Sequence, residues 1–265
     1  MKQYGLSKEL HETIANQLYE AERKNSHIRK LTEQYPQITQ EDAYAIQKIG
    51  LERRLKDGAK IVGRKIGITS SGMMKLLNCN TPDYGYLLDN MLVYEGNSVK
   101  SSELNIPLLE GEIAFIMGED LKGPGVTPAQ ILTCTAGVVP CFEVCDGRYE
   151  NWDVTVIDTI SDDAGAARFV LGGKPKRISD IDLRCIGMVI EKNGQFVGSA
   201  AGAEVMGSPI NSMAWLVNKL SQYGDGLHKG DVVLSGAFMS AIPSKTGDFY
   251  CLHVDGFPAL TLKFE

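Results

Sequence analysis

The feature that most constrains the fold of this chain is an apolar, strand-like run, residues 107–117, that carries two glutamates. Successive side chains of a β-strand point to opposite faces, so Glu110 and Glu112 leave the same face about 6.6 Å apart. Two like charges beside a hydrophobic core are unfavourable unless a cation lies between them, and a hard divalent cation prefers oxygen ligands. The simpler interpretation is an edge strand with a solvated acidic face. A third carboxylate, Glu143, lies in a second apolar run, residues 138–145, and favours the metal site.

The composition is that of a globular chain of 265 residues, 43% hydrophobic and 23% charged, long enough for one large domain with a small helical addition. The net charge is -6 and no Lys/Arg-rich block occurs, so the chain lacks the basic surface that nucleic acid or an anionic membrane would attract. No segment approaches the roughly 18 apolar residues of a membrane span. Residues 1–4 do not resemble the start of a signal peptide. We therefore expect a cytoplasmic protein without nucleic acid or membrane partners.

Residues 1–58 predict a helical N-terminal lobe. Apolar residues recur every fourth position after a possible Ser7 cap, and Thr39 begins a second helix with a sequence that resembles a capping box. Gly58 is expected to end this second helix. From residue 60 the pattern changes to β-branched runs separated by glycines and turn residues, so residues 59–265 predict a β domain.

Two charged residues stand out at the start of this β domain. Lys65 lies between two glycines in the run 60–68, where the glycines indicate that another group approaches the backbone closely. The lysine side chain could also simply extend to water. Asp83 lies in a turn-rich segment, residues 81–86, where it could be only a turn-forming residue. Neither residue alone distinguishes a structural role from a functional one.

The six cysteines do not form a metal or disulfide pattern. They are scattered, mostly among apolar residues, and no C-x-x-C pair occurs. We therefore expect buried free thiols in a reducing compartment rather than a disulfide framework or a thiolate zinc site. The four histidines show no H-x-x-x-H spacing and no nucleophile nearby.

The second half of the chain predicts more strands than helices. The polar stretch 146–163 is too long for a turn and indicates a loop that lines a pocket. Asn193-Gly194 predicts the tip of a hairpin over residues 187–196. No P-loop and no G-x-G-x-x-G motif follows any of the predicted strands.

Five ordered motifs carry a family resemblance that covers most of the chain. They are Val62-Gly63-Arg64-Lys65-Ile66-Gly67, Thr81-Pro82-Asp83-Tyr84-Gly85, Glu110-Gly111-Glu112-Ile113-Ala114, Pro140-Cys141-Phe142-Glu143-Val144 and Leu234-Ser235-Gly236. With these motifs the chain resembles the hydratase and decarboxylase branch of the fumarylacetoacetate hydrolase superfamily. The resemblance implies an α+β fold, with a mixed β-barrel-like core of that superfamily's C-terminal-domain type, flanking helices and a helical N-terminal lobe. It also implies a homo-oligomer and a Mg²⁺ or Mn²⁺ site built from Glu110, Glu112 and Glu143.

The same resemblance implies a hydratase of 2-hydroxy-dienoates from the meta-cleavage degradation of aromatic compounds. The enzyme would add water to 2-hydroxypenta-2,4-dienoate, through its 2-oxo-enoate tautomer, and give 4-hydroxy-2-oxopentanoate. A 2-oxo acid offers two oxygens to a cation, which stabilises the enolate. By the motif match, Lys65 and Asp83 are the candidate proton donors and acceptors, and Ser235 is a candidate substrate-binding residue. A lysine near a cation and an apolar wall is expected to have a lowered pKa.

Two alternatives stay open. A 4-oxalocrotonate decarboxylase would use the same metal enolate and lose CO₂. Asp83 favours the hydratase, because the decarboxylases carry an aliphatic residue there, whereas residues 148–151 resemble the decarboxylase loop. The chain could instead be a non-catalytic subunit that pairs with a decarboxylase in a complex. Asp163 and Gly165 replace the asparagine and serine of the family's usual Asp-Asn-Ala-Ser, so a change in substrate choice or a weaker activity is expected.

Overall fold

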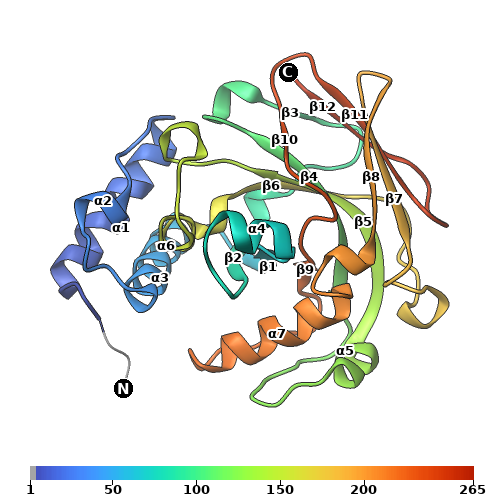
Figure 1. Ribbon diagram of the computed structural model, residues 1–265, viewed down its shortest axis with the longest axis horizontal. Helices are drawn as coiled ribbons and strands as arrows, with labels where there is room; N and C mark the ends of the chain where they lie inside the picture. Colours follow the sequence, from blue (N-terminus) through green and yellow to red (C-terminus); the bar gives the residue numbers. More distant parts are fainter. Residues whose placement is uncertain (1–3) are drawn as a thin grey trace.

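In the computed structural model, which describes residues 4–265, a group of helices lies beside a larger body of β-sheet (Figure 1). The α-helices are α1 (Lys8–Arg23), α2 (Leu31–Gln34), α3 (Gln40–Lys56), α4 (Ser71–Leu76), α5 (Pro128–Cys134), α6 (Val156–Ser161) and α7 (Pro209–Ser221). The strands are β1 (Ile61–Gly67), β2 (Asp83–Leu88), β3 (Ser98–Val99), β4 (Leu108–Met117), β5 (Thr135–Cys145), β6 (Ala166–Leu171), β7 (Gly187–Lys192), β8 (Gln195–Ala201), β9 (Val232–Leu234), β10 (Ile242–Pro243), β11 (Phe249–Val254) and β12 (Leu260–Phe264). Within residues 4–265, none of the helices has the length and apolar character of a membrane span.

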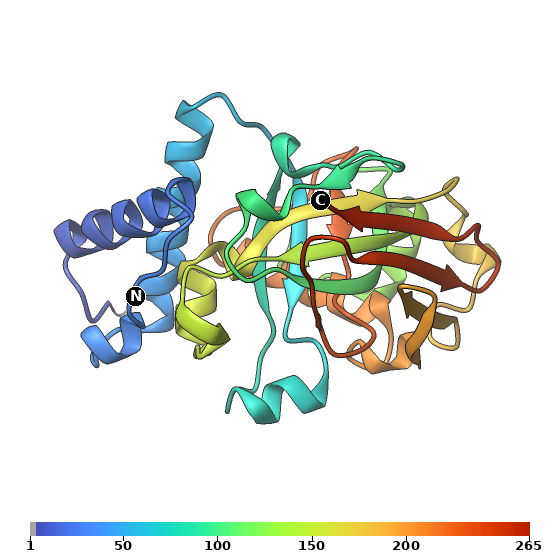
Figure 2. The ribbon, with the colours of Figure 1, turned by 90° about the horizontal axis from the view of Figure 1, so that it is seen from above.

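Two sheets form the β body. One has seven strands, in the order β2, β1, β9, β4, β5, β6 with β10 paired to β4, and the other has five, in the order β3, β12, β11, β7, β8. The larger sheet is mixed, since β1 and β9 run parallel while β4 and β5 run antiparallel. It curls into half a barrel, and α1, α2 and α3 gather at one end of the molecule (Figure 1, Figure 2). This architecture confirms the predicted α+β fold with a β-barrel-like core and flanking helices.

The contact between the two sheets determines which way the acidic strand faces. Phe142 of β5 packs against Tyr250 of β11, with ring centroids 6.5 Å apart, so apolar side chains of both sheets share one core. Gly111 of β4 lies directly against Ile190 of β7, and a Cβ at this glycine would be 2.8 Å from the Ile190 side chain. Alternate positions of a strand face opposite sides. The neighbours of Gly111, Glu110 and Glu112, therefore face away from the second sheet.

The N-terminal helices have capped ends and a small core of their own. Ser7 Oγ accepts a hydrogen bond from the amide of Leu10 (3.3 Å), and a capping box at Thr39 begins α3, as the sequence predicts. Gly58 takes the left-handed conformation (φ 102°) that follows the end of this helix. The separate core consists of Leu6, Ile14, Ala15, Leu18, Leu31, Ile38, Ile46 and Tyr149. We propose that residues 1–58 form a lobe and that residues 59–265 form the catalytic β domain.

Later elements match the sequence in part. The predicted hairpin is confirmed, because Asn193 (φ 53°) and Gly194 (φ 74°) take left-handed conformations between β7 and β8. The polar stretch 146–163 is not one continuous loop. Thr155 accepts a hydrogen bond from the amide of Asp158 and begins the short helix α6, which the sequence analysis does not predict.

All six cysteines are free, as expected. Cys141 and Cys145 are buried in β5, Cys185 is exposed, and the other three are half buried. The expectation of buried thiols is therefore wrong for four of the six, because apolar neighbours in the sequence do not show on which face of an element a residue lies.

Candidate active site

The acidic strand pairs with the strand that carries the third glutamate. In the antiparallel register of β4 and β5, Glu110 lies opposite Glu143, and Glu112 lies opposite Cys141. Glu112 and Glu143 are 0% and 1% exposed, and Glu110 is half buried. Residues directly opposite each other in a sheet share one face. The pairing therefore gathers the three carboxylates on the side that faces away from the second sheet.

A fourth residue, Cys145, joins this acidic cluster. One oxygen each of Glu110 and Glu143 and the sulfur of Cys145 lie within 4.8 Å of one another. The Cys145 thiol lies 3.6 Å from Glu110 Oε2 and donates a hydrogen bond to it. Glu112 is not a member of this close group, and its Oε2 accepts a hydrogen bond from the amide of Gly236 (2.7 Å).

The carboxylates suit a divalent cation. Among the described residues, both oxygens of Glu143 and Oε1 of Glu112 are buried without a hydrogen-bond partner, although Lys65 Nζ forms an ion pair with Glu143 Oε1 at 3.2 Å. A buried acceptor without a donor is unfavourable, and coordination of a hard cation by oxygen satisfies it. Glu110, Glu112 and Glu143 are therefore the residues that could hold a metal ion.

Burial controls the protonation of the acidic cluster. It raises the pKa of Glu110 from 4.5 to about 7, and the nearby charge of Glu143 adds to the effect. Burial, followed by the charges of Glu143 and Glu110, raises the pKa of Glu112 well above its ordinary value. Without a cation, the folded protein therefore retains protons on the cluster at pH values at which free carboxyl groups are ionised.

Lys65 of β1 is buried in contact with the cluster. Besides its ion pair with Glu143, its Nζ donates a hydrogen bond to the carbonyl oxygen of Ala164 (3.0 Å). Burial lowers the pKa of this lysine, but its electrostatic interactions with Cys145, Glu143 and the other acids raise it more, so the pKa lies well above its ordinary value. The expected lowering concerns a lysine beside a bound cation, so it stays a prediction; in the metal-free protein the acidic neighbours outweigh burial. A bound cation would oppose them.

Asp83 begins β2, opposite Gly67 of β1. Its Oδ1 occupies the space that a Cβ at Gly67 would need, and Lys65 Nζ lies 3.3 Å from the same point. Thr159 of α6 donates a hydrogen bond from Oγ1 to Asp83 Oδ2 (2.9 Å). Burial raises the pKa of Asp83, and the charge of Lys65 opposes this effect. The structure thus places a buried carboxylate beside the buried lysine.

A cavity of about 530 Å³ connects these groups. Lys65, Asp83 and Glu110 line it, together with Cys145 and Thr159. The two predicted catalytic residues and one predicted metal ligand therefore face the same space. Cys145 and Thr159 are additions that the sequence analysis does not single out.

Ser235, the predicted substrate-binding residue, is not among the residues that line this cavity. Its side chain is fully buried, and its Oγ lies 3.5 Å from the carbonyl oxygen of Gly236. The segment instead touches the acidic cluster through its backbone, because the amide of Gly236 donates to Glu112. The role of the Ser235 side chain stays a prediction.

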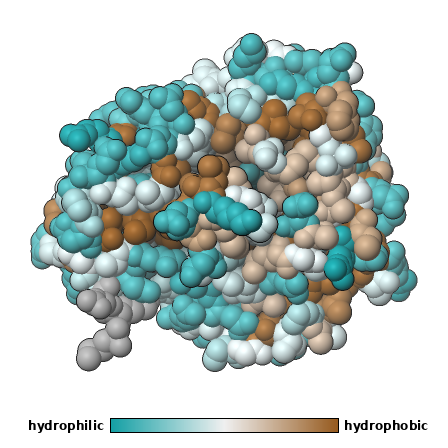
Figure 3. Space-filling view, viewed as in Figure 1, coloured by the Kyte–Doolittle hydropathy of each residue, from teal (hydrophilic) through white to brown (hydrophobic). Residues whose placement is uncertain are grey.

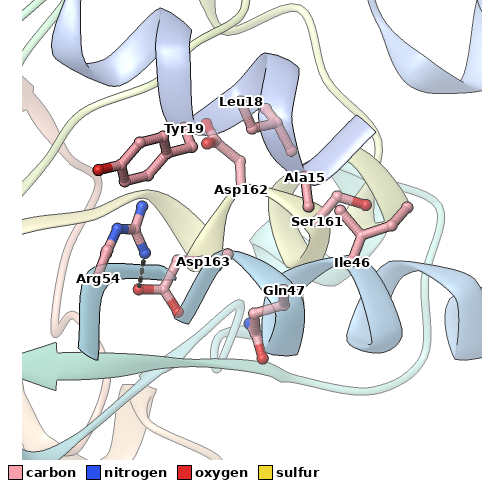
Figure 4. A pocket seen from close by; sticks show the side chains of 10 residues that line it. Ala15, Leu18, Tyr19, Ile46, Gln47, Arg54, Ser161, Asp162 and Asp163 are labelled. Carbon is pink, nitrogen blue, oxygen red and sulfur yellow. Dashed lines mark hydrogen bonds and ion pairs between the residues drawn. The ribbon is translucent and has the colours of Figure 1, made fainter. Parts of the chain in front are cut away.

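The loop between α6 and β6 holds Lys65 in place. Asp163 accepts a hydrogen bond from the amide of Tyr86 (2.9 Å) and pairs with Arg54 of α3 (3.2 Å), as Figure 4 shows for Arg54. Asp163 and Ala164 both take left-handed backbone conformations (φ 54° and 53°), which directs the carbonyl oxygen of Ala164 to Lys65. Asp163 therefore anchors the loop and does not itself line the cavity.

Comparison with known proteins places this chain in a family. No model of a protein family matches the chain. The 2-hydroxyhexa-2,4-dienoate hydratase of Comamonas testosteroni is 38% identical over 259 residues, which are 97% of this chain and 98% of that protein. The 2-hydroxypent-2,4-dienoate hydratase of Pseudomonas putida is 43% identical over 220 residues, which are 83% of this chain and 99% of that protein.

Solved structures agree with these relatives. The 4-oxalocrotonate decarboxylase from Pseudomonas putida G7, complexed with magnesium and adipate, has a TM-score of 0.97 and 34% identity over 99% of this chain and 100% of that one. Fumarylpyruvate hydrolase from Pseudomonas aeruginosa is similar in fold alone, with a TM-score of 0.60 at 13% identity over 76% of this chain and 88% of that one. The fold is that of the fumarylacetoacetate hydrolase superfamily. Within it, the chain belongs to the family of 2-hydroxy-dienoate hydratases and 4-oxalocrotonate decarboxylases.

Proposed function

We propose that this chain is a metal-dependent hydratase that adds water to 2-hydroxypenta-2,4-dienoate, as its 2-oxo-enoate tautomer, and forms 4-hydroxy-2-oxopentanoate. The position of Asp83 carries the proposal, because its carboxylate lines the same cavity as Lys65 and Glu110. Hydration needs a group inside the cavity that accepts a proton from water. The two hydratases that are 38% and 43% identical to the chain support the same reaction class.

Glu110, Glu112 and Glu143 would hold the cation, as Mg²⁺ or Mn²⁺. Their buried oxygens without hydrogen-bond partners support this ligand set. The cation would stabilise the negative charge that develops on the 2-oxygen of the substrate. The magnesium complex of the decarboxylase at 34% identity supports Mg²⁺ as the first ion to test.

Lys65 and Asp83 would move the protons. The buried ammonium group of Lys65 lies in the cavity beside Asp83 and Glu143, so it can give a proton to C5 and recover one from the 2-hydroxyl group when the dienol becomes the 2-oxo-3-enoate. The Asp83 carboxylate, oriented by Thr159, would then accept a proton from the water that adds to C4 and pass a proton to C3, so that the enolate becomes the 2-oxo acid. Ser235 stays a proposed substrate-binding residue, since Gly236 beside it contacts Glu112.

The direct test is a paired assay of the purified chain. We expect 2-hydroxypenta-2,4-dienoate to be converted to 4-hydroxy-2-oxopentanoate with Mg²⁺, and not after removal of the metal with a chelator. Product identification by NMR separates hydration from release of CO₂. Turnover of 4-oxalocrotonate with CO₂ release, and none of the dienoate, would overturn the proposal.

Decarboxylation of 4-oxalocrotonate is the second candidate function. It is favoured by the near-complete structural match to the decarboxylase, with a TM-score of 0.97. Asp83 argues against it, because a decarboxylase gains from an apolar wall around the departing carboxylate and this residue places a buried acid in the cavity.

An accessory role is the candidate from another class. A non-catalytic subunit would show no metal-dependent turnover alone and would change the activity of a paired decarboxylase.

We propose self-association as well, and a complex with such a decarboxylase, on the basis of the family. The six free cysteines support a reducing, cytoplasmic location.

A further inference from the structure

We infer that the active-site cavity selects substrates whose far end is apolar and uncharged, and that helix α4 provides this selectivity. The inference rests on the proposed function for the orientation of the substrate, because the 2-oxo acid head is taken to lie at the acidic cluster. It goes further by assigning the opposite end of the substrate to a named part of the fold.

Exposure shows the depth of each residue that lines the cavity. Lys65 and Asp83 are 3% and 2% exposed, so they form its floor. Met73 and Leu76 of α4 are 38% and 75% exposed, so they lie at its mouth. A substrate whose head is held at the floor therefore extends its other end toward α4.

The side of the mouth that α4 forms is apolar. Met73, Leu76 and the following Leu77 line it, and none of the residues of α4 is buried by the rest of the described chain. In Figure 3 a hydrophilic stretch crosses the middle of the face, where α4 lies in Figure 1, and apolar surface lies above it and to its left. Exposed apolar side chains that are continuous with an active-site cavity are typical of a binding surface. An apolar group of the substrate is the occupant that this surface fits.

Charge at the cavity excludes a second carboxylate. Lys65 is the one cationic residue among the described residues that line it, and its Nζ already contacts Glu143 and the carbonyl oxygen of Ala164. At the exposed part of the lining, Glu204 adds a negative charge, and Lys75 of α4 is not a lining residue. A carboxylate at the far end of a substrate would therefore lie near the negative charge of Glu204. Lys65, on the floor of the cavity, is too deep to pair with it.

Trp152 extends the apolar wall and packs against Gly165, whose left-handed conformation (φ 71°) also favours glycine. A Cβ at Gly165 would lie 3.0 Å from the Trp152 ring, so a residue with a side chain would crowd the indole. The indole is held by a hydrogen bond from Nε1 to the carbonyl oxygen of Ile106 (2.8 Å). At this position the chain has an apolar ring packed against a glycine.

The cavity also has room for a substituent. Its volume of about 530 Å³ lies within the range of pockets that bind drug-sized ligands. This volume is larger than a five-carbon acid would fill. Each methylene that leaves water for the apolar mouth should strengthen binding by up to about fourfold.

The test is calorimetric binding of saturated 2-oxo acids to the full-length protein with Mg²⁺. These acids cannot be hydrated, so the preference is measured independently of turnover. We expect the Kd to fall by up to about fourfold for each methylene from 2-oxopentanoate to 2-oxohexanoate and 2-oxoheptanoate. 2-Oxoadipate, which equals 2-oxohexanoate in carbon number but carries a second carboxylate, should bind at least about tenfold more weakly than 2-oxohexanoate.

Leu76→Lys assigns the preference to α4. The site is exposed, so the variant should fold, and we expect it to reduce the discrimination against 2-oxoadipate by about tenfold. Leu132→Lys is the matched control, because Leu132 lies in α5, is 43% exposed and does not line the cavity. Equal binding of 2-oxoadipate and 2-oxohexanoate by the unmodified protein, or an unchanged preference in Leu76→Lys, would overturn the inference. Failure to hydrate 2-hydroxypenta-2,4-dienoate would contradict the proposed function instead.

Discussion

Gly67 and Asp83 lie opposite each other in the β1–β2 pair, and the carboxylate of Asp83 occupies the space beside Gly67 where a side chain would be. The missing side chain allows the carboxylate to approach Lys65, two residues earlier on the same strand. Residues that are two positions apart on one strand have their side chains on the same face. This pair therefore connects a glycine in the sequence directly to the acid–base chemistry of the cavity.

Asp83→Asn should lower the rate of hydration by on the order of 10²-fold, the usual size of a lost general acid or base. Asparagine keeps the shape and can still accept the hydrogen bond from Thr159, so the melting temperature should not fall. Steady-state kcat for 2-hydroxypenta-2,4-dienoate checks the prediction, with Asp89→Asn as a control at an exposed position just after the same strand. Nearly full activity of Asp83→Asn would mean that the residue only shapes the turn.

Gly67→Ala should lower kcat by about 10²-fold, because displacing a catalytic group by about 1 Å is enough for such a loss. The added methyl group would overlap Asp83 Oδ1 and move the carboxylate away from Lys65. Gly50→Ala is the matched control, since its added Cβ meets no atom within 4 Å and it lies within helix α3. If Gly67→Ala retained full activity, the position of Asp83 would not limit the reaction.

Glu112→Gln should weaken Mg²⁺ binding by at least about tenfold and abolish metal-dependent turnover. The amide oxygen of glutamine can still accept the hydrogen bond from Gly236, so the fold should persist. Glutamine resembles the protonated side chain that burial favours at this position, so the melting temperature of the metal-free protein should not fall. Calorimetric titration with Mg²⁺ measures the affinity, and Glu119→Gln at an exposed position serves as control. Unchanged affinity would remove Glu112 from the ligand set.

Mg²⁺ affinity should rise with pH through about 7, because the pKa of Glu110 is raised to about 7 and a protonated carboxyl group does not coordinate the ion. In the metal-free protein the free energy of unfolding should instead fall as pH rises. Between the ordinary value of 4.5 and about 7 the folded state holds a proton that the unfolded state has released, so this group makes unfolding easier as pH rises. Titrations from pH 5.5 to 8.5, with and without the ion, check both trends; an affinity independent of pH would contradict them.

The protein should be at least a dimer at micromolar concentration. β8 is an edge strand of the five-stranded sheet, and its Phe196 and Val197 are 68% and 40% exposed. Exposed apolar groups on a sheet edge are typical of surfaces that pair with another chain. Sedimentation equilibrium measures the mass, and a single species of 28.9 kDa would disprove the prediction.

The two-residue period of a strand made the acidic cluster predictable. Glu110, Glu112 and Glu143 alternate with apolar residues, and the structure brings them to one face. The same period places Cys145 two residues after Glu143, so the sequence contained the signal for this thiol as well. The helix caps and the hairpin likewise followed from local patterns, which depend on neighbours in the chain, whereas the family resemblance implied the β-barrel-like core.

Other parts of the site depend on contacts between distant segments. Thr159 reaches Asp83 over 76 residues of sequence, and Ala164 reaches Lys65 over 99, so no local pattern indicates either contact. The pKa of Lys65 could not be inferred from its glycine neighbours, because its direction is the sum of burial and several acids from other strands. The backbone of Gly236, with φ 108°, determines how the Ser235 segment meets Glu112, and such a turn is not visible from side-chain type.

The carboxylate of Asp163 is shared between the guanidinium of Arg54 in α3 and the amide of Tyr86 in β2. The loop that offers its carbonyl oxygen to Lys65 is thus tied to both the N-terminal helices and the sheet. A shift of α3 relative to the sheet would therefore be transmitted to the buried ammonium group. In the sequence these helices are predicted only to pack against the sheet. In the structure they also fix the loop that contacts Lys65, so the geometry of the reactive groups depends on how tightly α3 packs against the sheet.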